Sequence, residues 1–362
     1  MGLVRLLLAL SVVITHSSPV FGMVLLDGDM AITGFFIISG FLMALILDVK
    51  YRDRLRAFYL NRLLRIYPPY LVALLLSVIV FSLFPNEHHG PAKVFTWLLE
   101  REAWQTLSVA VITNVTLVGI NLTRYMSVEE PSFQLIFPNF LQPGVGFGGH
   151  NLLFVPQGWT LALELYFYLL APLVCRLRTI VLVGAIVGLF YLSEEARQYL
   201  RHGGIDFPPD ASFPFQLKYF LLGVLGYRIM QPLQKAIEAD FFAAEYLPTL
   251  SLAAAILLVF AGSYMNDAGL DTEIFYLMFA STVPGMFLFG RDRKWDGRLG
   301  EYSYPVYLFH YMISTSADNW VPVDMMVFPT IALTLAISTG YIHFIDRPIM
   351  AYRAKISDQA KA

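Results

Sequence analysis

Apolar segments alternate with short polar and charged segments along almost the whole chain. Ten apolar runs come close to the ~20 residues that a helix needs to cross a bilayer. They lie near residues 3–20, 30–47, 68–84, 156–175, 179–192, 213–227, 247–264, 274–289, 302–316 and 325–345. The pattern predicts an all-α polytopic membrane protein with about ten transmembrane helices. The first run is predicted to remain as a span, because Arg5 and His16 lie inside it and no A-x-A-like cleavage site follows.

An eleventh apolar run, near residues 104–120, is interrupted by polar residues, and the distribution of Lys and Arg decides whether it crosses. With ten spans and a cytoplasmic N-terminus, most of the 25 Lys and Arg residues fall on the cytoplasmic side. The exceptions are Lys93, Arg101, Arg124, Arg197, Arg201 and Lys218. If 104–120 also crossed, every later segment would be inverted, against the positive-inside rule. We therefore expect an interfacial helix near 104–120 and cytoplasmic N- and C-termini.

The same topology gives a single transmembrane domain over residues 1–355 and a cytoplasmic tail over 356–362. The stretch 85–157 is rich in Pro, Gly, Phe and polar residues, and it lies between two predicted spans on the outer side. Segments of this kind place functional side chains over a rigid scaffold. We expect residues 85–157 to form an extracytoplasmic cap.

Composition agrees with a membrane location and excludes several classes of site. The chain is 57% hydrophobic and 14% charged, with a mean hydropathy of +0.60. A net charge of −2 gives no indication of nucleic acid as a partner. Cys175 is the only cysteine, which excludes an intrachain disulfide and a thiolate metal cluster, and we expect no metal site.

Two ionisable residues share one face of the first predicted helix. Arg5 and His16 are eleven residues apart, which at ~100° per residue is within about 20° of three full turns. They are separated by ~16 Å along the axis, with His16 toward the outer end. Ionisable groups inside a membrane usually line a cavity or a pathway. The alternative is structural, with His16 bonded to a neighbouring carbonyl and Arg5 extended to the interface.

Arg62 and Arg65 are three residues apart, just before the third predicted span. Residues at this spacing share a helix face, so two guanidiniums point together from the cytoplasmic surface. Paired guanidiniums suit phosphate groups. They would also serve simply as a topology anchor, and their spacing does not choose between these readings.

Glu164 lies in the outer half of the span 156–175, at a predicted depth close to that of His16. A carboxylate beside an imidazole is the usual support for a general base. We therefore predict a contact between them, with a carboxylate satisfied by Tyr166, Tyr168 or an Arg as the alternative. His310 is a second intramembrane histidine, for which core packing and function stay equally open.

Small residues on the second predicted helix form another candidate element. Ser39 and Gly40 lie within an apolar stretch, where small side chains let a helix or a thin ligand chain approach closely. A serine there is also a candidate nucleophile, although helix packing is its commoner role.

Taken in order, five motifs resemble those of the acyltransferase 3 family, integral-membrane O-acyltransferases that modify bacterial surface polysaccharides. They are the Arg5 and His16 pair and the segments 35–42, 62–68, 159–168 and 299–310. Thr160 stands where the family usually has Ser, and Asp346 stands where Glu is commoner. The acidic residue that the family often has before its Phe-Phe pair is replaced here by Thr33 and Gly34.

The resemblance implies a multi-pass protein of the bacterial inner membrane, surrounded by lipid, that moves an acyl group from cytoplasmic acyl-CoA. Acetyl is the family default, and the acceptor is a hydroxyl of an extracytoplasmic glycan or glycolipid. The implied roles are catalytic for His16 and Glu164, donor-binding for Arg5, Arg62, Arg65, Ser39 and Gly40, and acceptor-binding for Trp159, Tyr168 and His310.

Two questions stay open at this level. The sequence does not choose between direct transfer and an acyl-His16 intermediate. A secondary transporter or glycan flippase, with His16, Glu164 and His310 as a proton relay, is the alternative from another functional class.

Overall fold

The computed structural model describes residues 1–17, 25–84, 90–137, 146–202, 211–239, 244–317, 321–322 and 325–359. Its main helices are α1 (Gly2–Thr15), α2 (Gly28–Val49), α3 (Leu55–Leu83), α4 (Pro91–Glu100), α5 (Trp104–Thr116), α6 (Gly158–Val174), α7 (Thr179–His202), α8 (Phe213–Glu238), α9 (Leu247–Asp267), α10 (Thr272–Gly290), α11 (Lys294–Ala317), α12 (Val327–Tyr341) and α13 (Arg347–Gln359). Short 3₁₀ helices η1 (Ile120–Tyr125), η2 (Gly149–Leu152) and η4 (Ala244–Tyr246) and a π-helical turn η6 (Ile342–Asp346) connect them.

Every apolar run of the sequence contains a helix, as predicted. Six helical segments among the described residues are long and apolar enough to cross a membrane: α2, α3, α9, α10, Thr179–Leu200 and Val327–Ile356. α1 and α6 are shorter apolar helices. The chain is therefore a predominantly helical, multi-pass membrane protein. The count of ten spans and the cytoplasmic placement of the termini stay predictions.

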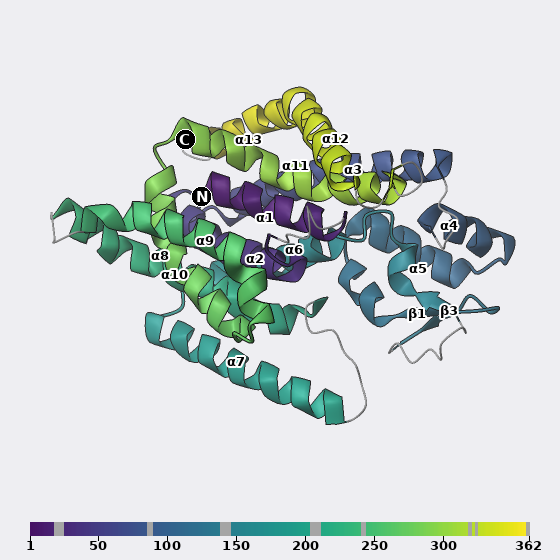
Figure 1. Ribbon diagram of the computed structural model, residues 1–362, viewed down its shortest axis with the longest axis horizontal. Helices are drawn as coiled ribbons and strands as arrows, with labels where there is room; N and C mark the ends of the chain where they lie inside the picture. The colour runs from purple at the N-terminus through teal and green to yellow at the C-terminus, as the bar shows by residue number, and fades with distance from the viewer. Residues whose placement is uncertain are drawn as a thin grey trace.

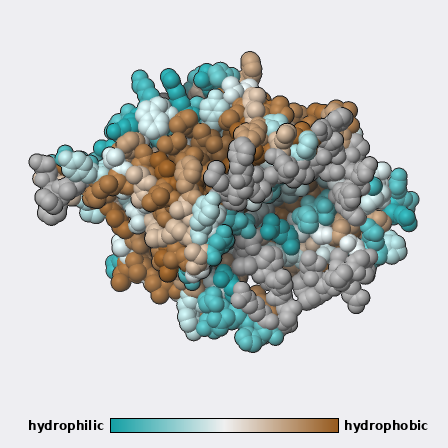
Figure 2. Space-filling view, in the orientation of Figure 1, coloured by the Kyte–Doolittle hydropathy of each residue, from teal (hydrophilic) through white to brown (hydrophobic). Residues whose placement is uncertain are grey.

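The outer surface of the helical part is apolar, as a bilayer requires. Ile180 and Val187 on α7 are 78% and 62% exposed, and Leu75 on α3 and Leu257 on α9 are exposed in the same way. Apolar side chains cover much of the helical part on the face shown in Figure 2. Apolar surface of this extent on a long helix indicates contact with lipid.

α3 is longer than its apolar run. It begins at Leu55 and has 29 residues, so it extends over roughly 43 Å, compared with a hydrocarbon core of roughly 30 Å. Its first turns, which carry Arg62 and Arg65, are therefore a continuation of the spanning helix. Because the two arginines are three residues apart on this helix, they share one helix face, as the sequence predicts.

The predicted cap has more regular structure than the sequence indicated. α4, α5 and a small antiparallel sheet lie together at one end of the molecule (Figure 1). The sheet has the order β2-β1-β3, from Ser127–Glu129, Leu135–Ile136 and Gly146–Gly148, and it packs with the two helices around Val94, Leu98 and Phe147. The all-α prediction missed this sheet because strands of two or three residues are too short to show an alternating pattern.

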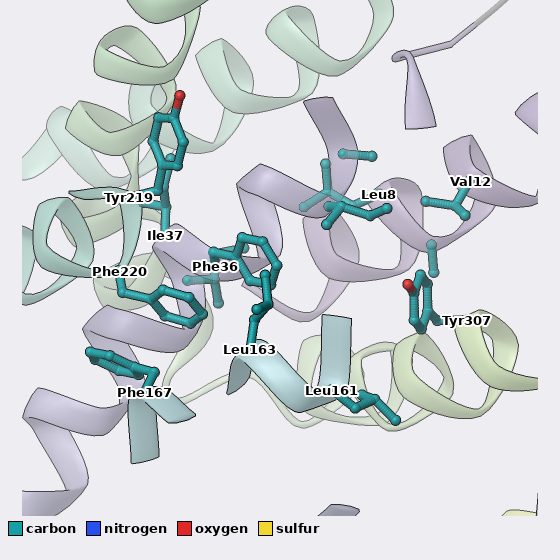
Figure 3. Close-up of a cluster of buried hydrophobic side chains, with 14 of the residues drawn as sticks. Leu8, Val12, Phe36, Ile37, Leu161, Leu163, Phe167, Tyr219, Phe220 and Tyr307 are labelled. Carbon is teal, nitrogen blue, oxygen red and sulfur yellow. The ribbon is translucent and has the colours of Figure 1, made fainter. Parts of the chain in front are cut away.

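α2 and α8 cross at unusually close range through two glycines. A methyl group on Gly40 would overlap the carbonyl of Phe220, and one on Gly223 would overlap the carbonyl of Ile37. Beside this contact, Phe220 stacks on Phe36 at 4.7 Å and on Phe167 at 4.3 Å between ring centroids (Figure 3). Small residues at such crossings let backbones approach where a bilayer supplies no hydrophobic drive for helix association.

The start of α1 is capped by a residue from α11. The Asp296 carboxylate accepts hydrogen bonds from the nitrogens of Met1, Gly2 and Leu3 at 2.8, 2.7 and 2.9 Å. These nitrogens belong to the first turn, where helix N–H groups have no partner within the helix. Asp296 therefore fixes the end of α1 that carries Arg5.

Replacing Asp296 with Asn is expected to destabilise the protein by about 1.5–3 kcal/mol near neutral pH, because Asn lacks the charge and one of the two acceptor oxygens that hold these nitrogens. Burial alone would raise the pKa of the Asp296 carboxyl, but the hydrogen bonds from Met1, Leu3 and Gly2 outweigh burial and lower it. A carboxyl with a lowered folded-state pKa stabilises the fold above its unfolded pKa and loses this contribution as the pH falls through the folded value.

Thermal unfolding of the purified protein at neutral and acid pH measures this effect. The matched control is Asp292→Asn, because the Asp292 side chain is 83% exposed and, in the part of the chain that the structure describes, pairs only with its neighbour Arg291. Equal stability of the two variants at neutral pH would show that the Asp296 cap contributes nothing.

Candidate functional site

A cavity of about 280 Å³ opens among α1, α2, α3, α6, α11 and α13, and we call it the central cavity. Its charged lining residues are Arg5, Arg62, Arg65, Arg353 and Glu164. Ser39, Thr160, Tyr168, Ser303, Tyr304 and Tyr307 supply polar groups, and apolar residues of α2 complete the wall. Four guanidiniums against one carboxylate give the cavity an excess of positive charge.

Arg62 and Arg65 lie on the cavity side of α3, each close to an aromatic ring. The Arg62 guanidinium is 6.0 Å from the ring centre of Tyr168, and that of Arg65 is 5.6 Å from the ring centre of Tyr304. Contacts of this kind fix a guanidinium while leaving its N–H groups available to a ligand. Sequence spacing alone correctly placed the two arginines together.

Arg353 was not identified as a site residue from the sequence. Its guanidinium donates to Asn61 Oδ1 at 2.8 and 3.2 Å, and Arg62 donates to the same oxygen at 3.1 Å. Asn61 is buried on α3 and so joins α13 to the Arg62 face of the cavity. Arg353 lies in a polar segment near the C-terminus, where its sequence gives no sign of a site. It reaches the cavity because α13 packs against α3.

A second cavity adjoins the first near the start of α1, and we call it the side cavity. It has a volume of about 330 Å³ and shares Arg5, Leu42 and Arg65 with the central cavity. Arg291, Asp296 and Glu301 are among its other lining residues. Arg5 and Arg65 therefore stand between the two cavities.

The sequence predicts a contact between Glu164 and His16, but among the described residues Glu164 has other partners. Its Oε2 accepts a hydrogen bond from the Tyr168 hydroxyl at 2.9 Å, and Ser39 lies beside both side chains. The guanidiniums of Arg5 and Arg65 are close enough to attract its charge. The alternative reading of the sequence, a carboxylate satisfied by Tyr166, Tyr168 or an Arg, agrees with the bond from Tyr168.

His16 lies instead beside His310. Their ring centroids are 5.1 Å apart with the planes inclined at 62°, and Tyr311 is on another side of His16 at 6.2 Å. The His16 side chain is exposed, whereas that of His310 is fully buried. Two of the histidines in predicted spans, His16 and His310, thus form one pair.

Backbone carbonyls set the same tautomer on both rings. His16 Nδ1 is 2.9 Å from the carbonyl of Val12, and His310 Nδ1 is 2.7 Å from that of Tyr307. A carbonyl only accepts, so each Nδ1 carries the hydrogen of the neutral ring and each Nε2 has a lone pair. Nε2 of His310 is buried and has no hydrogen-bond partner within the described part of the chain.

Tyr307 connects the histidine pair to the central cavity. It lines the cavity, its ring is 5.9 Å from that of His310, and its hydroxyl is bonded to Thr160 Oγ1 at 2.9 Å and to the carbonyl of Gln157 at 3.2 Å. His16 is not itself a lining residue. Ring contacts through Tyr307 and His310 therefore connect the wall of the central cavity to His16.

The remaining predicted site residues divide between cavity and scaffold. Ser39 and Tyr168 line the central cavity. Gly40 faces the α8 backbone, and Trp159 is buried under the Arg124 guanidinium at 5.0 Å. Neither Gly40 nor Trp159 is among the residues that line the cavity.

Comparison with known proteins identifies one family. A family model described as an acyltransferase domain matches residues 1–343 of the 362. No curated protein and no solved structure shows significant similarity to the chain. The match covers every helix that lines the central cavity except α13 and includes all the predicted site residues. The chain belongs to the acyltransferase 3 family and is a multi-pass membrane acyltransferase.

Proposed function

We propose that the protein transfers an acyl group, acetyl by preference, from cytoplasmic acyl-CoA to a hydroxyl of an extracytoplasmic glycan or glycosylated acceptor. The observation that carries this proposal is the arrangement of the central cavity. Four arginines line it, and contacts between the rings of Tyr307, His310 and His16 connect its wall to His16. This arrangement supports a polyanionic donor bound near a base.

The arginines suit the donor end of such a reaction. CoA carries several phosphate charges, and guanidiniums bind phosphate through paired, charge-assisted hydrogen bonds. We assign Arg62, Arg65 and Arg353 to these phosphates, with Arg5 at the junction with the side cavity. Glu164 then offsets part of the arginine repulsion and orients Arg5 and Arg65 while the donor is absent.

His16 suits the role of general base. Its Nδ1 is held by Val12, so Nε2 is the atom that accepts a proton from the acceptor hydroxyl. The hydroxyl oxygen then forms the new ester bond to the thioester carbon, and the carbon–sulfur bond breaks. The proton passes from His16 to the departing CoA sulfur, which leaves as a thiol.

His310 takes the supporting position that the sequence assigned to Glu164. Its Nε2 lone pair lies in a buried ring next to His16. When His16 gains a proton at Nε2, a neighbouring lone pair stabilises the imidazolium. We therefore assign His310 as a positioning residue for His16.

Replacing His310 with Phe is expected to lower the rate of acyl transfer roughly 10- to 100-fold, the effect of losing one hydrogen bond to a charged group. Asn keeps an acceptor at this position, so His310→Asn is expected to recover part of the rate while Phe does not. Steady-state transfer assays with both variants, at matched membrane levels, give the measurement. Equal rates for His310→Phe and His310→Asn would show that His310 contributes only through packing.

Mass spectrometry of envelope and secreted glycans tests the proposed function itself. Cells that express the protein are expected to contain a glycan heavier by one acyl unit than the same glycan from cells that lack the gene. Restoring the gene should restore the mass difference. Identical glycan masses in both strains, with the protein present in the membrane, would contradict the proposal.

A further inference from the structure

A polar cavity of about 510 Å³ lies outside the proposed catalytic path, between the ends of α2, α6 and α8 and the beginning of α7. Its polar lining residues include Asp48, Arg52, Arg176, Thr179, Tyr227 and Arg228. We call it the arginine cavity. It lies on the predicted cytoplasmic side and has no role in the proposed reaction.

Three guanidiniums converge there with little compensating charge. Among the described residues that line it, Asp48 is the only acidic one, and its Oδ2 accepts a hydrogen bond from the Tyr227 hydroxyl at 2.7 Å. In the described ranges, none of Arg52, Arg176 and Arg228 forms an ion pair with a carboxylate. Cations that are not neutralised by the protein attract an anionic ligand.

Neutral oxygens hold two of these guanidiniums in place. Arg228 donates to Thr179 Oγ1 at 2.9 Å, to the carbonyl of Cys175 at 3.2 Å and to the carbonyl of Leu177, and Arg176 donates to the carbonyl of Arg52. A guanidinium has five N–H donors, so these bonds orient the side chains without using all their donors. The cavity is thus prearranged for a ligand with several acceptor oxygens.

The surroundings of the cavity are compatible with two sources of such a ligand. On α6, Tyr168 of the central cavity and Pro172 of the arginine cavity are four residues apart, so one helix face borders both cavities. On α7, Ile180 and Val181 beside the cavity are 78% and 50% exposed, as expected of a surface in contact with lipid tails. A phosphate could therefore belong to the donor or to a phospholipid.

We propose that the arginine cavity is a phosphate-binding site, occupied either by the headgroup of an anionic phospholipid or by the 3′-phosphate of CoA. Phosphate is the shared chemistry, because its oxygens accept paired bonds from forked guanidiniums. Basic pockets between membrane helices on the cytoplasmic side bind anionic headgroups in this way. Only the CoA source rests on the proposed acyl transfer.

The test compares wild type with the double variant Arg52→Gln, Arg176→Gln. Arg228 is left intact because it ties together the connection between α6 and α7. The matched control is Arg178→Gln, an exposed arginine of the same connection that does not line the cavity. Thermal unfolding first checks that all three proteins are folded.

The probes are phosphatidylglycerol and phosphatidylcholine in mixed nanodiscs, followed by native mass spectrometry, and CoA and dephospho-CoA in binding titrations. A lipid site predicts that wild type and Arg178→Gln retain phosphatidylglycerol preferentially and that the double variant loses this preference by roughly tenfold. A donor site predicts that wild type binds CoA roughly tenfold more tightly than dephospho-CoA and that the double variant binds both equally.

The two results identify the source, and either supports a phosphate site. If the double variant matches Arg178→Gln in both lipid retention and the ratio of CoA to dephospho-CoA affinity, the proposal is overturned. Because the lipid measurement needs no acyl transfer, failure of the proposed function and failure of this inference are distinguishable.

Discussion

Replacing His16 with Gln is expected to lower acyl transfer by roughly 10²- to 10⁴-fold, the usual contribution of a general base. Gln keeps a donor for the carbonyl of Val12 and a similar size, so the end of α1 should stay intact. What it lacks is the basic Nε2 next to His310. Donor affinity should stay within a few-fold of wild type, since His16 does not line the central cavity.

His343→Gln is the matched control for His16. The His343 ring is exposed, and its Nδ1 contacts the carbonyl of Thr339, four residues earlier, at 2.9 Å, as His16 contacts Val12. His343 is not among the residues that line the three cavities, so transfer should be unchanged. If His16→Gln retained the rate of His343→Gln at equal membrane levels, the assignment of His16 as the base would be wrong.

Replacing Arg62 and Arg65 together with Gln is expected to weaken acyl-CoA binding by at least roughly 100-fold. Each charge-assisted contact to a phosphate contributes about 1.5–3 kcal/mol, so the loss of two is large even if the effects do not add fully. Acceptor affinity should change little. Titration of a nonhydrolysable acyl-CoA analogue into the purified protein measures the affinity for the donor directly.

Arg56→Gln is the control for this pair, because Arg56 is an exposed arginine of the same helix and lines neither cavity of the proposed donor path. It should leave donor affinity unchanged. The opposite pattern, in which the double variant loses acceptor binding and retains the donor, would leave Arg62 and Arg65 as topology anchors.

Features that depend on a single helix could be predicted from the sequence. Apolar runs predicted the helices, and the three-residue spacing of Arg62 and Arg65 predicted their common face. The family match over residues 1–343 confirms the resemblance carried by the five motifs. These features need only local geometry and the order of segments along the chain.

Relations between helices could not be read in the same way. Glu164 and His16 have similar predicted depths, but depth gives neither the rotation of a helix nor its position along the membrane normal. Leu117 and Ile120 of the cap cover Gly158 at the start of α6, so this helix begins beneath the cap. Glu164 accordingly lies at the level of Ser39 and Arg5, and His310 takes the place beside His16.

The most direct test of the account is transfer across a sealed membrane. Oriented proteoliposomes would receive radiolabelled acetyl-CoA only on the cytoplasmic face, with envelope glycan from cells lacking the gene only on the opposite face. The account predicts labelled ester on the glycan, absent with His16→Gln and absent when the donor is confined to the glycan side. Transfer only when both substrates share one side, or glycan movement across the membrane without acetyl-CoA, would contradict it.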